Sequence, residues 1–302
     1  MTVTASIRLP ATTVRRRRAA FQRLIKGIIG VIVAVIAACL LWEGYKALGQ
    51  LTGDFVPSTG IPLPVSTSDK AMPHLSTIFD ALFSPASAAS SQTLAVYYLE
   101  QTSVTLREAL YGMLVGAAIG VVLAVILREI SFLGRGVLPW LVISQTIPLV
   151  ALAPIIVVWV GGAGLPSWVA VSIIAAYLSF FPVTVNMLTG LNSADAIHLE
   201  FMRSIAAPNW MTMFFIRLPG ALPNLFTGLR LAATASVIGA IVGELSAGTG
   251  LGIGRAILTA AFYFSNAPEN LFAAVAVAAI GGVLFVQLIT LAEAFVLRKR
   301  SQ

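Results

Sequence analysis

The sequence predicts an all-α, polytopic membrane protein with about six transmembrane helices. Of its 302 residues, 58% are hydrophobic and only 10% are charged, and the mean hydropathy is +0.92. A soluble globule cannot cover its surface with so few polar side chains. A span needs about 20 apolar residues, and its backbone polar groups must be satisfied inside a helix. Long, continuous apolar runs therefore indicate helices and not barrel strands.

Six such runs can be read along the chain. They cover approximately residues 28–48, 104–127, 137–160, 167–188, 225–245 and 271–297. The third contains Pro139, Pro148 and Pro154, which remove helical hydrogen bonds and tend to kink or unwind a helix. Such a break inside a membrane is expected to line a protein interface or a cavity.

The segments between these runs define the expected domain organisation. A basic segment, 1–27, precedes the first span, 28–48, and an external linker, 49–103, leads to the core transmembrane domain, 104–297, which is followed by a short tail, 298–302. One short helix is expected in the linker after Pro73, because its apolar residues recur at helical spacing. This stripe is formed by Leu75, Ile78, Phe79, Leu82 and Phe83. It favours a helix lying at the membrane interface, and contact with an external binding protein is the alternative.

The distribution of basic residues predicts the orientation. Fourteen of the nineteen lysines and arginines fall on one side when the N-terminus is placed in the cytoplasm, including seven in the first 27 positions. Only Lys46, Lys70 and Arg255 fall outside. Topology and anionic lipid explain the net charge of +7, so no nucleic-acid partner is expected. The N-terminus has a second interpretation, a cleavable export signal before Gly49, but its apolar run of some 20 residues favours an anchor.

A polar segment, about 190–224, is expected in the cytoplasm between the fourth and fifth spans. Asp195 and Glu200 lie early in a short predicted helix, where acidic side chains suit the N-terminus. Apolar residues recur every four positions, which gives a face able to enter a groove. Pro208 is expected to start a second short helix, and the pair at 218–219 to end it before the membrane. Helix, break and helix could pass a rigid-body movement to the spans. The alternative is a hairpin that packs only on its own bundle. The apolar face consists of Ile197, Phe201 and Ile205.

This segment resembles the EAA loop of the membrane subunits of bacterial ABC importers. That pattern has Glu-Ala-Ala, then Gly, then Leu-Pro at fixed offsets, and it is matched here without a gap by Glu200, Trp210, Leu218, Pro219 and Pro223. The departures are Phe201 and Met202 for the two alanines and Ala206 for the glycine. The resemblance covers residues 102–300 and is nearest to permeases of the nitrate, sulfonate and taurine type. It implies the type I importer fold and a coupling helix in a loop formed by Asp195, Glu200, Phe201, Arg203, Ala206, Trp210, Leu218 and Pro219.

The resemblance also implies partners and a location. A permease of this kind works with a second permease subunit, expected here as a homodimer, and with a cytoplasmic ATPase dimer that binds ATP and magnesium. An external binding protein delivers the solute, which would be nitrate, a sulfonate, taurine or a pyrimidine precursor of thiamine. Both termini would be cytoplasmic and the chain would lie in the bacterial inner membrane.

The sequence offers no catalytic or cofactor site. The chain contains no G-x-x-x-x-G-K-[ST] phosphate loop, and the glycines in SAGTGLGIGRA lack the lysine and are expected in an external turn. His74 and His198 are placed on opposite sides of the membrane, so they cannot share a metal. Cys39 is the single cysteine, which excludes an internal disulfide and a cysteine-based metal site. A transport subunit without enzymatic activity or cofactor is therefore predicted.

Polar residues at membrane depth usually face protein or water. Candidates for the translocation path are Gln145, Thr146, Tyr177, Asn186 and Ser236, with hydrogen bonds between neighbouring helices as the alternative role. Glu244 and Glu293 are expected to be interfacial or paired, and Gly112, Gly116 and Gly120 to allow close helix contact. An alternative function is a secondary transporter or channel subunit that needs no ATPase, which inverted repeats and a buried mid-span acid or base would favour. An intramembrane enzyme would need a cluster of reactive groups, and none is convincing.

Overall fold

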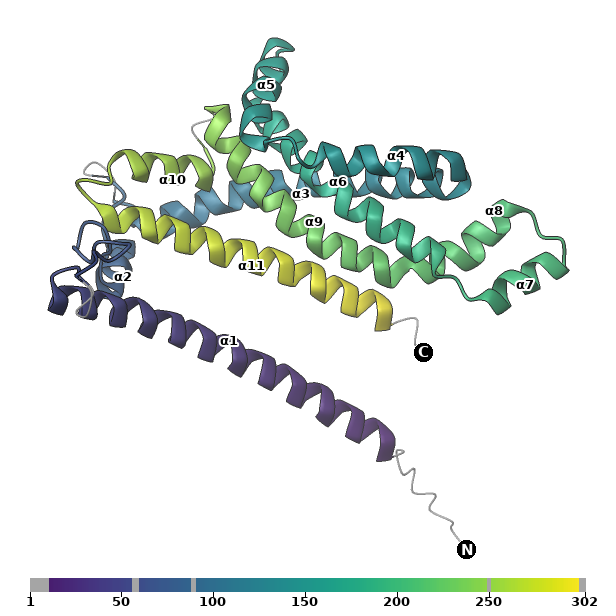
Figure 1. Cartoon of the computed structure of the whole chain (residues 1–302), viewed down its shortest axis with the longest axis horizontal. Helices are drawn as coiled ribbons and strands as arrows, with labels where there is room; N and C mark the ends of the chain where they lie inside the picture. The colour runs from purple at the N-terminus through teal and green to yellow at the C-terminus, as the bar shows by residue number, and fades with distance from the viewer. Residues whose placement is uncertain (1–10, 56–59, 88–90, 249–250, 299–302) are drawn as a thin grey trace, which may run out of the picture. The chain divides into compact units, whose positions relative to one another are not determined.

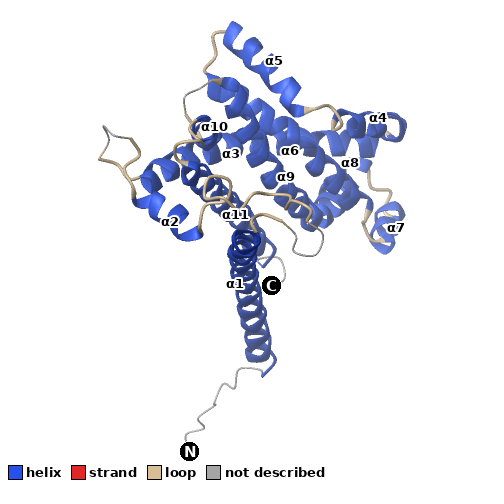
Figure 2. Ribbon diagram, turned by 60° about the vertical axis from the view of Figure 1, so that its left-hand side comes forward, coloured by secondary structure: helices blue, strands red, loops and turns tan. Residues whose placement is uncertain are grey.

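The computed structural model describes residues 11–55, 60–87, 91–248 and 251–298. Residues 1–10 of the predicted basic segment, 249–250 of the predicted glycine-rich turn and 299–302 of the predicted tail lie outside these ranges. The chain divides into two compact units, residues 1–78 and 79–302, which are described separately. Figure 2 shows that the described part consists of helices and loops, with two isolated β-bridges and no strand.

The N-terminal unit is built on the long helix α1 (Ala11–Thr52), which contains the predicted first span. The chain turns after α1 at Gly53 and Asp54, both with positive φ. The segment that follows folds back on the end of α1. Lys46 is fully buried, and its ammonium donates to the Met72 carbonyl at 2.6 Å and to Asp69 at 2.5 Å. The first part of the predicted linker thus packs on the end of α1, and its external position stays a prediction.

Further contacts order this segment. The Glu43 carboxylate accepts the Leu75 N–H at 2.7 Å, and the Trp42 indole donates to the Pro73 carbonyl. The pKa of the Asp54 carboxyl is held below its ordinary value by hydrogen bonds from the Thr67 hydroxyl and N–H and from Ser66. Hydrogen bonding from the Lys46 ammonium lowers the pKa of Asp69 in the same way. The sequence did not predict this network, because it joins residues 12 to 32 positions apart.

The second unit is a bundle whose centre is formed by α3 (Leu94–Glu129), α6 (Ser167–Asn192) and α9 (Leu218–Ala247), with α11 (Pro268–Arg298) beside α9 and α3 (Figure 1). Their shared core contains Ala109, Met113, Val171, Val183 and Ala233. In the described part of the chain, four helices are long and apolar enough to cross a membrane. The chain is thus an all-α, polytopic membrane protein.

Small residues set the distance between the central helices. A Cβ added to Gly112, Gly116 or Gly120 of α3 would come within 2.4 to 2.7 Å of α6. On the other side of α6, a Cβ at Gly239 of α9 would lie 2.9 Å from Ala175. Close approach through small residues is typical of packed helices in membranes. The glycine triplet on the second span thus packs within this chain, a point that the sequence left open.

The third predicted span does not form one straight helix. It is divided into α4 (Ser131–Ser144) and α5 (Leu149–Gly162), whose axes differ by 91°. An angle of this size fits a broken span or a re-entrant loop. The break falls at Pro148, which precedes the first residue of α5. Proline has no N–H to donate and disfavours helix at the residue before it. Pro139 and Pro154, by contrast, lie inside the two helices.

Two of the short helices lie along the chain just before α3 and just before α11. The predicted amphipathic helix is α2 (Leu75–Phe83), in which Phe79 and Phe83 stack at 5.1 Å and are exposed. Its position at a membrane interface stays a prediction. The second, α10 (Ile253–Phe262), was not predicted, although the glycine-rich turn before it was. Gly248 and Gly252 have φ of +59° and +94° in that turn, which favours glycine. Helix α3 also begins ten residues before the predicted span, at Leu94.

Candidate functional site

The segment that resembles the EAA loop begins with a capped helix, α7 (Ala196–Ser204). The Asp195 carboxylate accepts the Ile197 N–H at 3.1 Å, which satisfies one of the free donors at the start of the helix. Glu200 lies one turn further on and is exposed. The prediction that Asp195 and Glu200 lie early in a short helix thus agrees with the structure, and the side-chain cap at Asp195 is an addition to it.

The end of α7 is closed by two backbone hydrogen bonds. The Ala206 N–H donates to the Arg203 carbonyl and the Ala207 N–H to the Met202 carbonyl, each at 3.0 Å. This pair of bonds is a Schellman motif, and it requires a left-handed residue at its centre. Ala206 supplies it with φ of +51°. The pattern that this loop resembles has glycine at this position, and glycine adopts the left-handed conformation without a steric cost from a Cβ.

An apolar face of this loop is exposed. Ile197, Phe201 and Trp210 are 72%, 60% and 59% exposed, and Ile205 is exposed as well. The opposite side of α7 packs through Met202, which is buried. The loop therefore does not bury all its apolar residues on its own bundle. That exposure suits a face entering a partner's groove, and the partner itself stays a prediction.

The return to the membrane is a continuous helix. Pro208 caps α8 (Asn209–Thr212) as predicted, and a π-helical turn, η1 (Met213–Arg217), joins α8 directly to α9. The expectation that Leu218–Pro219 ends the second helix was therefore wrong. Proline in a regular helix clashes with the carbonyl four residues earlier. The wider π turn just before Pro219 relieves that conflict.

One side chain joins the two ends of the loop. The Arg217 guanidinium donates to the Leu191 carbonyl at 2.8 Å, and this carbonyl lies in the last turn of α6. Nearby, a Cβ at Gly190 would lie 2.9 Å from the side chains of Ala221 and Asn224. The loop is thus held at both ends by α6 and α9, the two central helices that contact each other most extensively.

The predicted path residues are only partly brought together. Gln145 and Thr146 lie in the break between α4 and α5, where the Tyr177 hydroxyl of α6 donates to the Ser144 carbonyl. Asn186 and Ser236 instead donate to carbonyls of their own helices, at 2.8 and 2.9 Å. The structure groups the first three residues at one break and leaves the other two in helix packing. Their role in a path remains a prediction.

A buried polar cluster anchors α10. At its N-terminus, the Gly252, Ile253 and Gly254 N–H groups donate to Gln101, Thr105 and Glu244 at 2.7 to 2.8 Å. Glu244 is fully buried in α9 and its carboxylate is occupied by the Gly254 N–H, while its predicted place near the membrane interface stays a prediction. Gln101 and Thr105 lie one turn apart on α3, and Glu108, also buried, follows them. Their i, i+4, i+7 spacing in an apolar helix was the signal that could have identified this cluster.

The other acidic residue expected near a span end is paired. Glu293 of α11 lies 3.3 Å from the Arg230 guanidinium of α9. Pairing is the usual condition for charged groups at membrane depth. This ion pair therefore agrees with the prediction of a paired role.

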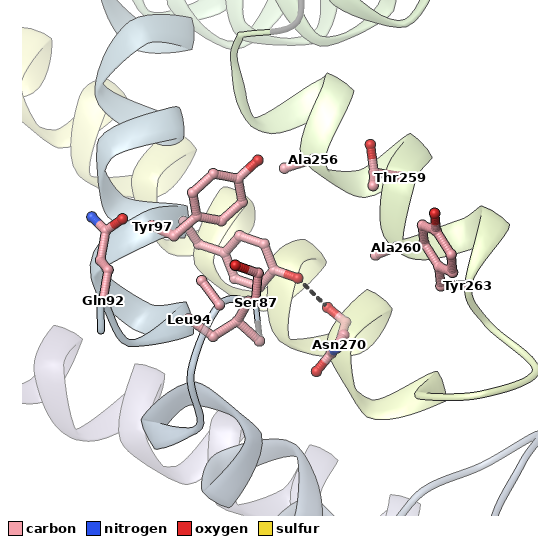
Figure 3. Close-up of a pocket in the computed structure, with 11 residues that line it drawn as sticks. Ser87, Gln92, Leu94, Tyr97, Ala256, Thr259, Ala260, Tyr263 and Asn270 are labelled. Carbon is pink, nitrogen blue, oxygen red and sulfur yellow. Dashed lines mark hydrogen bonds between the residues drawn. The ribbon is translucent and has the colours of Figure 1, made fainter. Parts of the chain in front are cut away.

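A pocket of about 580 Å³ opens between α10, the start of α3 and the start of α11 (Figure 3). Tyr97 and Tyr98 of α3 form one wall, and Tyr263 lies across from them at the end of α10. The Tyr98 hydroxyl donates to the Asn270 carbonyl at 3.0 Å and joins α3 to α11. This pocket was not predicted from the sequence. The remaining lining residues are Ala86, Ser87, Gln92, Leu94, Ala256, Thr259 and Ala260.

Residues 116–301 match the family described as binding-protein-dependent transport system inner membrane component. The chain belongs to this family. The match begins within α3 and contains the loop and the helices on both sides of it.

Relatives within the transport family share substantial identity. The chain is 42% identical over 143 residues to the formylaminopyrimidine transport permease protein ThiX of Halalkalibacterium halodurans, a match over 46% of this chain and 56% of that protein. It is 29% identical to the riboflavin transport system permease protein RibX of Chloroflexus aurantiacus over 81% of each chain. The match to the first of these relatives thus spans little more than half of its length.

The fold is also found in a solved structure. A chain in the crystal structure of an amino acid ABC transporter with histidines superposes with a TM-score of 0.53 at 18% identity, over 66% of this chain and 94% of that one. At this identity the likeness concerns the fold alone. For this member of the inner membrane component family, it agrees with the predicted importer-type permease architecture.

Proposed function

We propose that this chain is the permease subunit of an ATP-driven ABC importer that moves a small solute across the cytoplasmic membrane. The observation that carries the proposal is the loop 195–219, whose capped helix exposes an apolar face while both its ends are tied to the central helices. Membership in a family of binding-protein-dependent transport components supports it. The chain itself is a transport subunit, and ATP with magnesium would be bound by a separate ATPase.

The geometry gives the loop a mechanical role. Residues 209–247 form one continuous helical segment through η1, so displacement at Trp210 is carried into α9. Arg217 carries the same displacement to α6. Closure of an ATPase pair would then move the centre of the bundle as a rigid body. This movement would open the pathway outward to accept the solute.

The partners follow from that role. A cytoplasmic ATPase dimer would contact the loop, a second copy of this chain would complete the pathway, and an external binding protein would deliver the solute. A twofold pair is reasonable, because one bundle of this size encloses little and most oligomers are symmetric. Both termini would then lie in the cytoplasm of a bacterial cell, and the chain in the inner membrane.

The relatives bear on the solute. ThiX and RibX are named for formylaminopyrimidine and riboflavin, which are both heteroaromatic. We accordingly favour a pyrimidine-like solute over the small anions, nitrate and sulfonates, that the sequence also suggested.

The proposal is tested by co-purifying the chain with its cognate ATPase. The native chain should hold the ATPase in a stable complex, and Glu200→Ala and Glu200→Lys should lose assembly or lose coupled ATP hydrolysis by about tenfold. Glu100→Lys is the matched control, because Glu100 is also exposed on a helix but lies outside the loop. If the native chain binds no ATPase in gentle detergent, a secondary transporter becomes the better description.

A further inference from the structure

The pocket between α3, α10 and α11 has the size and lining of a small-molecule site. Its volume of about 580 Å³ falls within the range of about 300 to 1,000 Å³ found for such sites. Alanines at 256 and 260 keep the α10 side open, while Tyr97 and Tyr263 present rings from two different helices. Flat aromatic rings bind by stacking on such side chains.

The lining indicates an uncharged ligand. None of the described residues that line the pocket carries a charge. A nitrate or sulfonate would lose its hydration there without a lysine or arginine to replace it, which is unfavourable. The amide and hydroxyl side chains of Asn270 and Thr259 can instead exchange hydrogen bonds with ring heteroatoms.

The pocket walls are held in place before any ligand binds. Helix α10 is fixed at its N-terminus by Gln101, Thr105 and Glu244, at distances of 2.7 to 2.8 Å. The wall formed by Tyr98 is fixed by its hydrogen bond to the start of α11. A site whose walls are already ordered loses less entropy on binding.

We propose that this pocket binds an uncharged, flat heteroaromatic solute of one or two rings, stacked between Tyr97 and Tyr263. The inference rests on the proposed function for its place in transport, since the pocket lies on the face that the importer orientation makes external. A solute released by the binding protein would stop there before it enters the bundle.

Binding can be measured directly on the full chain in lipid nanodiscs without an ATPase. Equilibrium dialysis with radiolabelled cytosine and adenine should show saturable binding, and methanesulfonate and nitrate should not compete. Tyr97→Ala and Tyr263→Ala should each weaken binding by about tenfold, the loss expected for one stacking partner. Tyr97→Phe and Tyr263→Phe should retain binding, because they keep the ring and also control for folding.

A matched control and a blocking variant complete the test. Tyr111→Ala removes a tyrosine of the same helix that packs on Trp168 outside the pocket, and it should leave affinity unchanged. Ala260→Trp should fill the pocket and abolish binding. The proposal is overturned by absence of saturable binding, by equal binding of methanesulfonate, or by affinities that do not follow the pocket variants. If the chain still assembles with the ATPase in such a case, the pocket proposal fails and the proposed importer function is unaffected.

Discussion

At the scale of single residues, the loop contains a strained position. Ala206 has φ of +51°, a conformation that costs a residue with a Cβ about 1 kcal/mol or more. The two bonds of the Schellman motif hold it there, between Met202 and Ala207. The related loops avoid this strain with glycine. Alanine at position 206 thus costs the loop conformational free energy that glycine would not cost.

We expect Ala206→Gly to stabilise the loop. The gain should be about 0.5 kcal/mol, because removal of the left-handed strain is partly offset by the greater backbone freedom of unfolded glycine. Hydrogen exchange at the Ala207 amide, which donates to the Met202 carbonyl, measures this gain in local stability. Ala207→Gly is the control, since Ala207 has no positive φ and glycine there should destabilise. Equal effects of the two substitutions on hydrogen exchange would show that the left-handed conformation of residue 206 does not affect the stability of the loop.

At the scale of elements, the start of α10 depends on side chains from two other helices. Four backbone N–H groups at any helix start lack partners within the helix. Here three are satisfied by residues that are 10, 148 and 151 positions away. The turn leaves no room for larger residues, because a Cβ at Gly252 would lie 2.2 Å from the Glu244 carboxyl carbon. The cluster is therefore explained by helix capping and does not by itself favour an ion-coupled transporter.

We expect Glu244→Ala to loosen α10 and Glu244→Gln to preserve it. Alanine leaves the buried Gly254 N–H without an acceptor, which costs about 1 to 3 kcal/mol, whereas glutamine keeps an oxygen in place. Hydrogen exchange across 253–262 should be faster in the alanine variant and close to native in the glutamine variant. If glutamine loosens α10 as much as alanine does, the charge of Glu244 matters and not its acceptor oxygen.

The elements also show which features a sequence can reveal. The long helices, α2, the break near Pro148 and the place of Asp195 at the start of a short helix follow from apolar spacing and local residue chemistry, and they were predicted. The 91° angle between α4 and α5, the folding back onto Lys46 and the anchoring of α10 depend on contacts between distant segments. Apolar periodicity reports only on neighbours within a few turns. The loop 195–219 was identified because its chemistry is local, and the pocket beside α10 was missed because three separate helices form it.

At the scale of the whole chain, the second unit contains features that suit the transmission of movement. The glycines of α3 and α9 bring both helices against α6, and close packing of this kind deforms little. At the loop end of these helices, α6 and α9 are joined by Arg217. At the other end of α9, Glu244 holds the helix that forms one wall of the pocket. A displacement of the loop can thus reach the pocket wall through α9 alone.

The connection through Arg217 can be tested separately from docking. Arg217→Met removes the bond to the Leu191 carbonyl but leaves the exposed face at Ile197 and Phe201 intact. We therefore expect the ATPase still to assemble with the variant, while solute uptake per ATP hydrolysed falls by about tenfold, as loss of a charged hydrogen bond would allow. Uptake and hydrolysis measured together in proteoliposomes give this ratio. Arg107→Met, an exposed arginine on α3 away from the loop, should leave it unchanged. An unchanged ratio in Arg217→Met would mean that movement reaches the bundle through α9 without α6.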